Sequence, residues 1–365
     1  MVLLTDAELT DRILGHVDAG TTDVAPEVWR EPVEHYRTPE RLHAEVHDVL
    51  RRRFVALCPS AALPKPGSYV ARTVAGVPLV AVRGRDGVAR VFRNSCRHRG
   101  TAVASGSGCA TSFVCPFHGW VYGTDGALRH VPDAYGFPGL DTGSRWLVGV
   151  RVVERAGLVF AAQEDPYAGE EDLTDLPDVV GADYVLFNQS ELLVDANWKV
   201  LLEGFLEGYH IKATHRETFF PFGYDNVNVI ETLGRHSRVT FPFRRIEKLR
   251  DVPPPQRRLD GLITVVYHLF PNVIVAQLSH HTSLVVLEPE TTERTRMVTY
   301  QLGLPSAAES VARDAKFVDQ GQVEDREMAL TVQRGLAAGA NEVLEFGLFE
   351  GAITHFHRQL AELLK

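Results

Sequence analysis

The sequence is poor in several features that would assign the chain to a specialised class. It has only four cysteines in 365 residues, too few for a disulfide framework. No apolar run approaches the roughly 18–20 residues needed to cross a bilayer, and the N-terminal residues lack the basic region of a signal peptide. The 38 basic residues are outnumbered by 47 acidic ones, with no lysine-rich patch. We therefore expect no membrane or nucleic-acid partner, and a reducing cytoplasm as the location.

The composition is otherwise that of an ordinary globular protein, with 45% hydrophobic and 23% charged residues and enough length for two or three cores. Residues 1–50 carry a helical apolar pattern, and residues 51–163 alternate like short antiparallel strands broken by glycine turns. An acidic linker opens residues 164–365, where six further strands and two helices, 307–338 and 345–364, are expected. The sequence thus predicts an α+β fold with an N-terminal helical segment that packs on the C-terminal domain.

Two cysteine–histidine pairs stand in the strand-rich segment. Cys96 and His98 form the first pair, and Cys115 and His118 form the second, which begins after a gap of sixteen residues. Mixed thiolate and imidazole ligation suits either zinc or a [2Fe–2S] cluster. Zinc fingers usually group like ligands and place the histidines on a helix, whereas here each turn contributes one of each. A structural zinc knuckle is the alternative.

The spacing C-x-H followed by C-x₂-H resembles that of the Rieske cluster, in which two cysteines hold one iron and two histidines the other. The resemblance covers roughly residues 55–160 and implies that these two pairs bind a [2Fe–2S] cluster. Respiratory Rieske proteins carry a further cysteine on each loop, but here Phe117 occupies the position on the second loop. The resemblance is therefore to the soluble oxygenase type, in the lower part of the potential range.

Residues 197–215 contain the second candidate site. Apolar residues recur there at helical spacing, and Glu203, Glu207 and His210 share a second helical face. His215 follows five residues after His210. Two imidazoles and acidic groups on an apolar helix are costly to bury without compensation, and a metal ion is the simplest compensator. A buried helix with hydrogen-bonded histidines is the alternative.

The acid-x₂-His-x₄-His pattern resembles the mononuclear iron motif of Rieske non-haem iron oxygenases, and the resemblance then extends over the whole chain. It implies a Rieske domain of small antiparallel sheets at 51–163. A catalytic domain of helix-grip fold would follow at 164–365, with a central antiparallel sheet and long C-terminal helices. His210 and His215 would bind Fe²⁺ together with one carboxylate. Residues five apart on an ideal helix point about 140° apart, so we expect the helix to widen or break between the two histidines.

Two adjacent acids are candidates for the carboxylate ligand. An apolar helical stripe passes through Met328, Val332 and Leu336. Asp325 lies on this stripe, where a lone carboxylate needs a partner, whereas Glu324 lies toward a polar face. An Asp a few residues before Val-Gln-Arg-Gly-Leu also matches the family pattern. Asp325 is the expected ligand and Glu324 the alternative.

Glu207 occupies the position of the acidic bridge in the resembled family. There it would connect a histidine of the Rieske cluster to a histidine that binds the iron. The two centres of one chain are thought too distant in family members, so the cluster would belong to a neighbouring subunit, which implies a ring-shaped homotrimer. Most relatives carry Asp at this position. The Glu resembles the subgroup that oxidises quaternary ammonium compounds such as carnitine, choline and betaines.

The resemblance implies the terminal oxygenase component of a ring-hydroxylating or quaternary-ammonium system. It would use O₂ and electrons from NAD(P)H to hydroxylate or oxidatively demethylate a small organic substrate. A separate reductase or ferredoxin would deliver the electrons, because no Gly-x-Gly-x-x-Gly segment follows a strand here. An electron carrier without oxygenase activity and a zinc-stabilised binding module are the alternatives. About three irons per chain indicate the oxygenase, and about two indicate the carrier.

The residues that would select the substrate are less defined. A quaternary ammonium group calls for an aromatic cage, and the candidates are Phe220, Phe222 and Tyr224. An aromatic acid calls for an arginine in an apolar pocket, and the candidates are Arg235 and Arg238.

Overall fold

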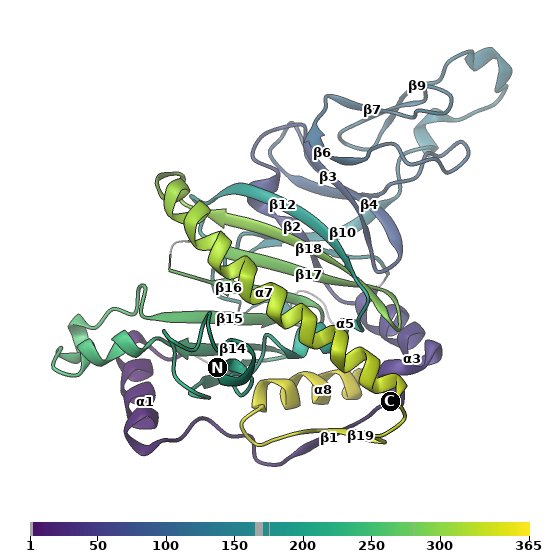
Figure 1. Cartoon of the computed structure of the whole chain (residues 1–365). Helices are drawn as coiled ribbons and strands as arrows, with labels where there is room; N and C mark the ends of the chain where they lie inside the picture. The colour runs from purple at the N-terminus through teal and green to yellow at the C-terminus, as the bar shows by residue number, and fades with distance from the viewer. Residues whose placement is uncertain (1–2, 165–170, 175, 280) are drawn as a thin grey trace. The chain divides into compact units, whose positions relative to one another are not determined.

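The computed structural model divides the chain into two compact units (Figure 1). One unit is discontinuous and combines residues 1–49 with residues 171–365, and the other is the inserted segment 50–170. The cysteine–histidine pairs lie in the inserted unit, and the second candidate site lies in the discontinuous unit. The structure describes residues 3–164, 171–174, 176–279 and 281–365. The middle of the expected acidic linker falls outside these ranges.

The inserted unit is built on antiparallel sheets, as expected. One sheet has seven strands in the order β2-β11-β10-β5-β4-β3-β6, and the other has three in the order β7-β8-β9. The strands are β2 (Val55–Pro59), β3 (Ser68–Val74), β4 (Val77–Arg83), β5 (Ala89–Arg93), β6 (Gly106–Cys109), β7 (Ser112–Val114), β8 (Val121–Gly123), β9 (Leu128–His130), β10 (Gly149–Arg155) and β11 (Leu158–Ala162). Its 3₁₀ helices are Ser60–Ala62, Ala134–Gly136 and Thr142–Ser144.

The hairpin between β3 and β4 shows how the local sequence sets this sheet. Val74 pairs with Val77, which leaves a two-residue loop of Ala75 and Gly76. Both loop residues have positive φ, 47° and 79°, as the tight turn of a right-twisted hairpin requires. Burial alternates along most of β3, so one face of the strand lies on the core.

The discontinuous unit contains a second seven-stranded antiparallel sheet, in the order β12-β18-β17-β16-β15-β14-β13. Its strands are β12 (Val185–Val194), β13 (Val229–Leu233), β14 (His236–Pro242), β15 (Ile263–Leu269), β16 (Val273–Gln277), β17 (Thr282–Thr291) and β18 (Arg294–Gly303). Six of them match the expected strands. The edge strand β12 was not expected, because most of its residues are exposed or half-buried and its sequence does not alternate.

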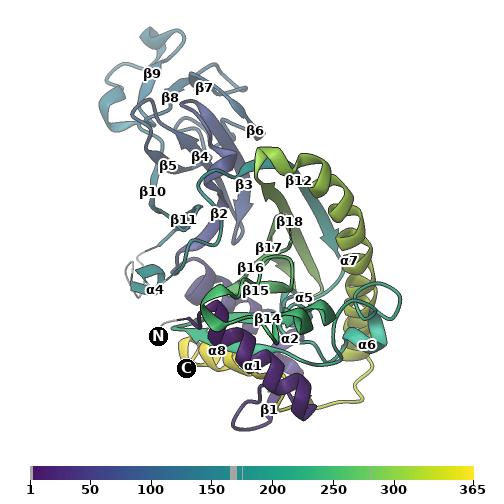
Figure 2. The same cartoon turned by 90° about the vertical axis from the view of Figure 1, so that its left-hand side faces the viewer.

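Helices pack on this sheet, and the long α7 runs along one face of it (Figures 1 and 2). The helices of the unit are α1 (Asp6–Ala19), α2 (Glu34–Arg37), α3 (Pro39–Ala44), α4 (Glu171–Thr174), α5 (Trp198–Glu203), α6 (Ile211–Thr214), α7 (Ala308–Ala337) and α8 (Gly351–Leu363). Short 3₁₀ helices are Arg244–Leu249, Pro254–Gln256 and Pro305–Ala307, and Glu45–Leu50 is a π-helix. Among the described residues, no helix combines the length and apolar character that a membrane crossing would require.

The N-terminal segment is less helical than expected. Trp29–Pro32 forms strand β1, which pairs with Val343–Phe346, strand β19, in a separate two-stranded sheet. The helix expected over residues 345–364 therefore begins only at Gly351. Neither strand showed an alternating pattern long enough to be recognised, because each has four residues.

Helix α5 anchors the segment that carries the second site. Trp198 is fully buried and packs edge-to-face on Phe356, with ring centroids 5.6 Å apart. Its indole Nε1 donates to Glu45 at 2.9 Å, and Lys199 forms a buried ion pair with the same carboxylate. The beginning of the stretch 197–215 is thus fixed in the core of the unit.

Candidate metal centres

Two loops of the inserted unit close in the same way around the expected cluster ligands. The amide of Gly100 donates to the carbonyl of Cys96 at 2.9 Å, and the amide of Gly119 donates to that of Cys115 at 3.0 Å. Both glycines have positive φ, 85° and 70°, which other residues rarely adopt. The glycines allow each chain segment to turn back directly after its ligands.

The four expected ligands lie with the thiols inside and the imidazoles outside. Cys96 and Cys115 are 4% and 2% exposed, whereas His98 is half-buried and His118 is exposed. The two imidazole rings lie 4.8 Å apart, and Trp120 stacks on His98 with a centroid distance of 5.0 Å. Two inner thiols and two outer imidazoles fit a [2Fe–2S] cluster whose irons have different ligands.

Tyr122 contacts the cluster loops and was not predicted from the sequence. Its hydroxyl accepts a hydrogen bond from the amide of Arg97 at 2.8 Å and lies 3.3 Å from Sγ of Cys96. A Cys96 thiolate bound to a cluster carries no proton, so the hydroxyl would be the donor in this contact. Burial and the hydrogen bond to Cys96 raise the pKa of Tyr122, so the phenol stays protonated. The sequence signal was a tyrosine four residues after His118.

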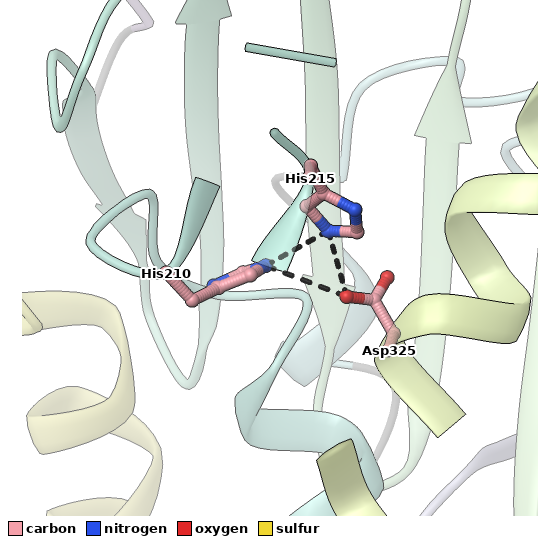
Figure 3. Close-up of side chains that lie close together, drawn as sticks. All are labelled: His210, His215 and Asp325. Atoms are coloured by element: carbon pink, nitrogen blue, oxygen red, sulfur yellow. Dashed lines mark hydrogen bonds and ion pairs between the residues drawn. The ribbon is translucent and has the colours of Figure 1, made fainter. Parts of the chain in front are cut away.

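The second site lies where the expected helix is interrupted. Helix α5 ends at Glu203, and the single turn of α6 begins only at Ile211. The helix therefore breaks before His210, and the expectation of a break between His210 and His215 was wrong in position. The consequence for the histidines is the expected one, since both rings point to the same place (Figure 3).

Three ligand atoms converge at this place (Figure 3). Nε2 of His215 lies 2.8 Å from Oδ1 of Asp325 and 3.2 Å from Nε2 of His210. Nε2 of His210 lies 3.5 Å from Oδ1 of Asp325. The facing ring nitrogens cannot both carry a hydrogen without repulsion. Two imidazoles and one carboxylate on one side fit an Fe²⁺ ion and leave positions for other ligands.

Each imidazole is held from behind by a second carboxylate. Nδ1 of His210 contacts Oε1 of Glu207, and Nδ1 of His215 lies 2.8 Å from Oε2 of Glu324. The hydroxyl of Thr218 also donates to Glu324, at 2.6 Å. A carboxylate on the outer ring nitrogen fixes the tautomer in which Nε2 is free to bind a metal.

The structure therefore separates the two candidate acids on α7. Asp325 faces the two histidines, and Glu324 lies on the outer side of His215. The reasoning from an apolar stripe was wrong in part, because Met328 and Val332 are about half exposed. Leu336 is buried, as expected.

The carboxylates control protonation in the absence of metal. Burial lowers the pKa of His210, but the hydrogen bonds to Asp325 and Glu207 outweigh it and raise this pKa to about 10. Burial raises the pKa of Asp325, and the contacts with the two histidines lower it below its usual value. In the metal-free site, a proton on His210 thus supplies the positive charge that a bound metal ion would otherwise supply.

Phe219 packs against the site and depends on a glycine of α7. Its ring lies 4.6 Å from that of His215. A Cβ atom at Gly321 would lie 2.1 Å from the same ring, far closer than a contact permits. A glycine inside a long helix weakens the helix, so its presence there needs a reason. Gly321, four residues before Asp325, was therefore the signal in the sequence that another side chain packs closely against the helix.

The aromatic residues suggested as a cage lie around an arginine of the chain itself. The guanidinium of Arg244 is 5.4 Å from the ring centroids of both Phe220 and Tyr224. Phe222 is about half exposed. Two of the three rings thus already face a cation.

The two suggested arginines also have partners. Arg238 forms an ion pair with Glu231, and Arg235 donates to Gln359 at 2.7 Å. Neither contact involves His210, His215 or Asp325.

Comparison with known families decides the class of the protein. Residues 181–365 match the ring hydroxylating alpha subunit (catalytic domain) family, and residues 53–141 match the Rieske [2Fe-2S] domain. The chain belongs to the ring-hydroxylating alpha subunit family. As a member of this family it is a Rieske-type non-haem iron oxygenase, with a Rieske [2Fe–2S] cluster and a mononuclear iron as its cofactors.

Individual proteins are similar to the chain in sequence or in fold. The chain is 26% identical over 377 residues to the carnitine monooxygenase oxygenase subunit of Escherichia coli (strain K12), covering 93% of this chain and 95% of the relative. Its fold matches the quaternary ammonium Rieske monooxygenase CntA, with a TM-score of 0.81, 22% identity and full coverage of both chains. Naphthalene 1,2-dioxygenase from Rhodococcus sp. matches with a TM-score of 0.77 and 20% identity, over 98% of each chain.

Proposed function

We propose that this chain is the terminal oxygenase component of a multicomponent system that inserts oxygen from O₂ into a small organic substrate. The observation that carries the proposal is the presence of two separate donor sets in one chain. Two thiols and two imidazoles lie in the inserted unit, and two imidazoles and a carboxylate lie in the discontinuous unit. An electron carrier needs only the first set, and a zinc module needs neither iron site.

The proposal assigns the cluster to Cys96, His98, Cys115 and His118. It assigns the mononuclear iron to His210, His215 and Asp325. An iron held by these residues would supply open positions for O₂ beside the substrate. The surrounding residues Glu207, Glu324 and Thr218 hold the two imidazoles in the orientation that binding requires.

Glu207 is proposed as the bridge for electrons between the two centres. Its Oε2 accepts from the amides of Tyr209 and His210, and its Oε1 contacts Nδ1 of His210. A carboxylate oxygen has two lone pairs, so Oε1 retains the capacity to accept from a second imidazole. We propose that a cluster histidine of a neighbouring subunit provides it, in a homotrimer.

Quaternary ammonium compounds are the proposed substrate class, with oxidation or demethylation next to the nitrogen. The similarity to a carnitine monooxygenase subunit over most of both chains supports this choice, and so does Glu207, whose residue type resembles that of the quaternary-ammonium subgroup. Electrons would come from NAD(P)H through a separate reductase or ferredoxin in the cytoplasm, where unpaired Cys96 and Cys115 remain reduced.

The test uses anaerobically purified protein with its natural metal content. We expect about three irons per chain, and substrate-dependent O₂ consumption with L-carnitine or another betaine when a reductase is supplied. A panel that includes aromatic acids separates the substrate classes. About two irons per chain would support an electron carrier instead, and consumption stimulated only by aromatic acids would overturn the proposed substrate class.

A further inference from the structure

The ring of Phe219 lies between a histidine ligand and the helix that carries the carboxylate ligand. Its centroid is 4.6 Å from that of the His215 ring, and the two planes are tilted by 51°. The tip of the ring meets α7 at Gly321, where a Cβ atom would lie 2.1 Å from Cζ and 2.4 Å from Cε2. Gly321 precedes Asp325 by four residues, so the two positions share a face of α7. Phe219 thus contacts one ligand and the turn of α7 that precedes another.

Short turns after His215 hold this ring in place. The carbonyl of His215 accepts from the amide of Phe220 at 3.0 Å. The carbonyl of Phe219 accepts from the amides of Phe222 and Gly223, each at 3.0 Å. With its tip against α7 and its backbone fixed by these bonds, the ring is pre-organised, so a molecule that binds against it has little ordering of the chain to overcome.

Accessible surface remains beside the ring. The side chains of Asp325 and His210 are 26% and 21% exposed, whereas that of His215 is only 1% exposed. Phe219 itself is half-buried. Nε2 of His215 lies 2.8 Å from Oδ1 of Asp325, so a ring that packs on His215 is close to the point where the three ligand atoms converge. A substrate of a few heavy atoms that reaches this point can therefore touch the ring.

The carboxylates next to the two imidazoles favour a cation. Asp325 faces Nε2 of both His210 and His215. Glu207 contacts Nδ1 of His210. Glu324 contacts Nδ1 of His215. These three carboxylates carry three negative charges, and Fe²⁺ would bring two positive ones, which leaves one negative charge on the groups that contact the imidazoles. A positively charged substrate is attracted to such a site, and an anion is repelled.

An aromatic ring is a suitable partner for a quaternary ammonium group at this place. Such a group has no N–H to donate, so the carboxylates attract it only through its charge. The face of a phenyl ring attracts the same charge and packs against the methyl groups. The rings of Phe220 and Tyr224, on the same segment, already face Arg244. Phe219 instead packs on an iron ligand.

We propose that Phe219 recognises the quaternary ammonium group of the substrate through contact of the methyl groups with its ring. The inference rests on the proposed substrate class and deepens it, because it assigns the residue that distinguishes a cation from a neutral molecule of the same shape. Oxidation next to the nitrogen requires the nitrogen to lie near the iron, and a ring packed on an iron ligand is within reach of it. Recognition makes and breaks no bond, so Phe219 is a specificity-determining residue.

The test measures binding without turnover, by calorimetric titration of the anaerobic holoprotein with its cluster oxidised. The two ligands are γ-butyrobetaine and the acid of the same shape in which carbon replaces the quaternary nitrogen. Phe219→Leu should weaken binding of γ-butyrobetaine about 5- to 30-fold and leave that of the carbon analogue within about twofold, with unchanged iron content. Phe220→Leu is the matched control, because it removes the neighbouring ring, which faces Arg244. It should leave both affinities within about twofold.

A second variant, Phe219→Met, keeps more of the volume of the ring and separates loss of the aromatic face from loss of packing. Selective weakening of γ-butyrobetaine in both variants supports the inference. Equal weakening of both ligands, no weakening of either, or loss of iron from both variants overturns the role of Phe219 in recognition and leaves the proposed function intact. If the wild-type chain binds neither γ-butyrobetaine nor choline, the proposed substrate class fails together with the role of Phe219.

Discussion

Asp325 and Glu324, neighbours on α7, contact opposite nitrogens of a single imidazole. Oδ1 of Asp325 lies 2.8 Å from Nε2 of His215, and Oε2 of Glu324 lies 2.8 Å from Nδ1 of the same ring. Adjacent residues of a helix point about 100° apart, so the ring of His215 lies between the two side chains. One acid thus faces the centre, and the other supports its ligand.

This arrangement predicts different effects for the two acids. Asp325→Ala should remove the mononuclear iron and leave the cluster, so that iron falls from about three to about two per chain. Glu324→Gln should retain the iron with roughly 10- to 100-fold lower affinity, because it weakens only the support of His215. Iron analysis together with the visible spectrum of the cluster measures both. Equal loss of iron in the two variants would contradict the assignment.

The proposed electron bridge predicts loss of turnover without loss of metal. Glu207→Gln can still accept from Nδ1 of His210 but carries no charge. We expect both centres to be loaded at saturating iron, and coupled product formation to be nearly abolished. The control is Glu217→Gln, which neutralises an exposed acid on the same segment. Normal turnover in Glu207→Gln would refute the bridge.

Binding of iron should depend on pH through His210. Its pKa of about 10 in the metal-free site means that Fe²⁺ must displace a proton at neutral pH. The apparent affinity should therefore rise roughly tenfold per pH unit until the pH approaches that value. Titration with Fe²⁺ under anaerobic conditions at several pH values measures the slope. A flat dependence would show that no proton is displaced.

The same shift predicts how the metal-free protein responds to pH. The pKa of His210 is raised above its usual 6.5, so its contribution to stability is fully present below pH 6.5 and is lost as the pH rises through about 10. The melting temperature of the metal-free protein should fall over this interval. Iron should reverse the trend, because it replaces the proton between the same groups.

Tyr122→Phe should lower the reduction potential of the cluster. The hydroxyl of Tyr122 lies 3.3 Å from Sγ of Cys96 and would donate to a cluster-bound thiolate there. A hydrogen bond to a ligand sulfur stabilises the reduced, more negative cluster. Removal of the hydroxyl leaves the packing of the ring unchanged. A redox titration of the cluster measures the change. An unchanged potential would mean that the hydroxyl does not act on the sulfur in the loaded protein.

Gly321→Ala should destabilise the protein although alanine favours helices. The substitution gains about 1 kcal/mol of helix propensity, but it places Cβ 2.1 Å from the ring of Phe219, and overpacking costs about 1–3 kcal/mol. Gly335→Ala is the matched control on the same helix, because no atom lies within 4 Å of its added Cβ. We expect a lower melting temperature and weaker iron retention only in Gly321→Ala.

The residues of the two candidate sites were easier to identify in the sequence than the backbone around them. The ligand types and spacings of Cys96, His98, Cys115 and His118 were visible because cluster chemistry fixes them. The positions of His210 and His215 were visible because the ligands of a mononuclear metal are likewise fixed in type and spacing. The break of the helix at Glu203 was not, because the apolar spacing continues through it and tertiary packing overrides the local pattern.

Other features depend on contacts that no local pattern records. The pairing of Trp29–Pro32 with Val343–Phe346 joins segments some three hundred residues apart in the chain. The contact of His357 with Glu31 and Glu203 also requires three separate elements. A buried histidine with distant partners cannot be recognised in a single sequence, because neither its burial nor its partners can be inferred from the residues next to it in the chain.

The insertion of residues 50–170 between the two parts of the other unit has a consequence for synthesis. During translation, the cluster-binding segment is complete before most of the sheet that surrounds the iron ligands has left the ribosome. Strand β1, by contrast, has no partner until Val343–Phe346 emerges near the end of synthesis. All four residues proposed for the cluster are therefore synthesised before the first residue proposed for the iron, and the iron site lacks its carboxylate until Asp325 has been added.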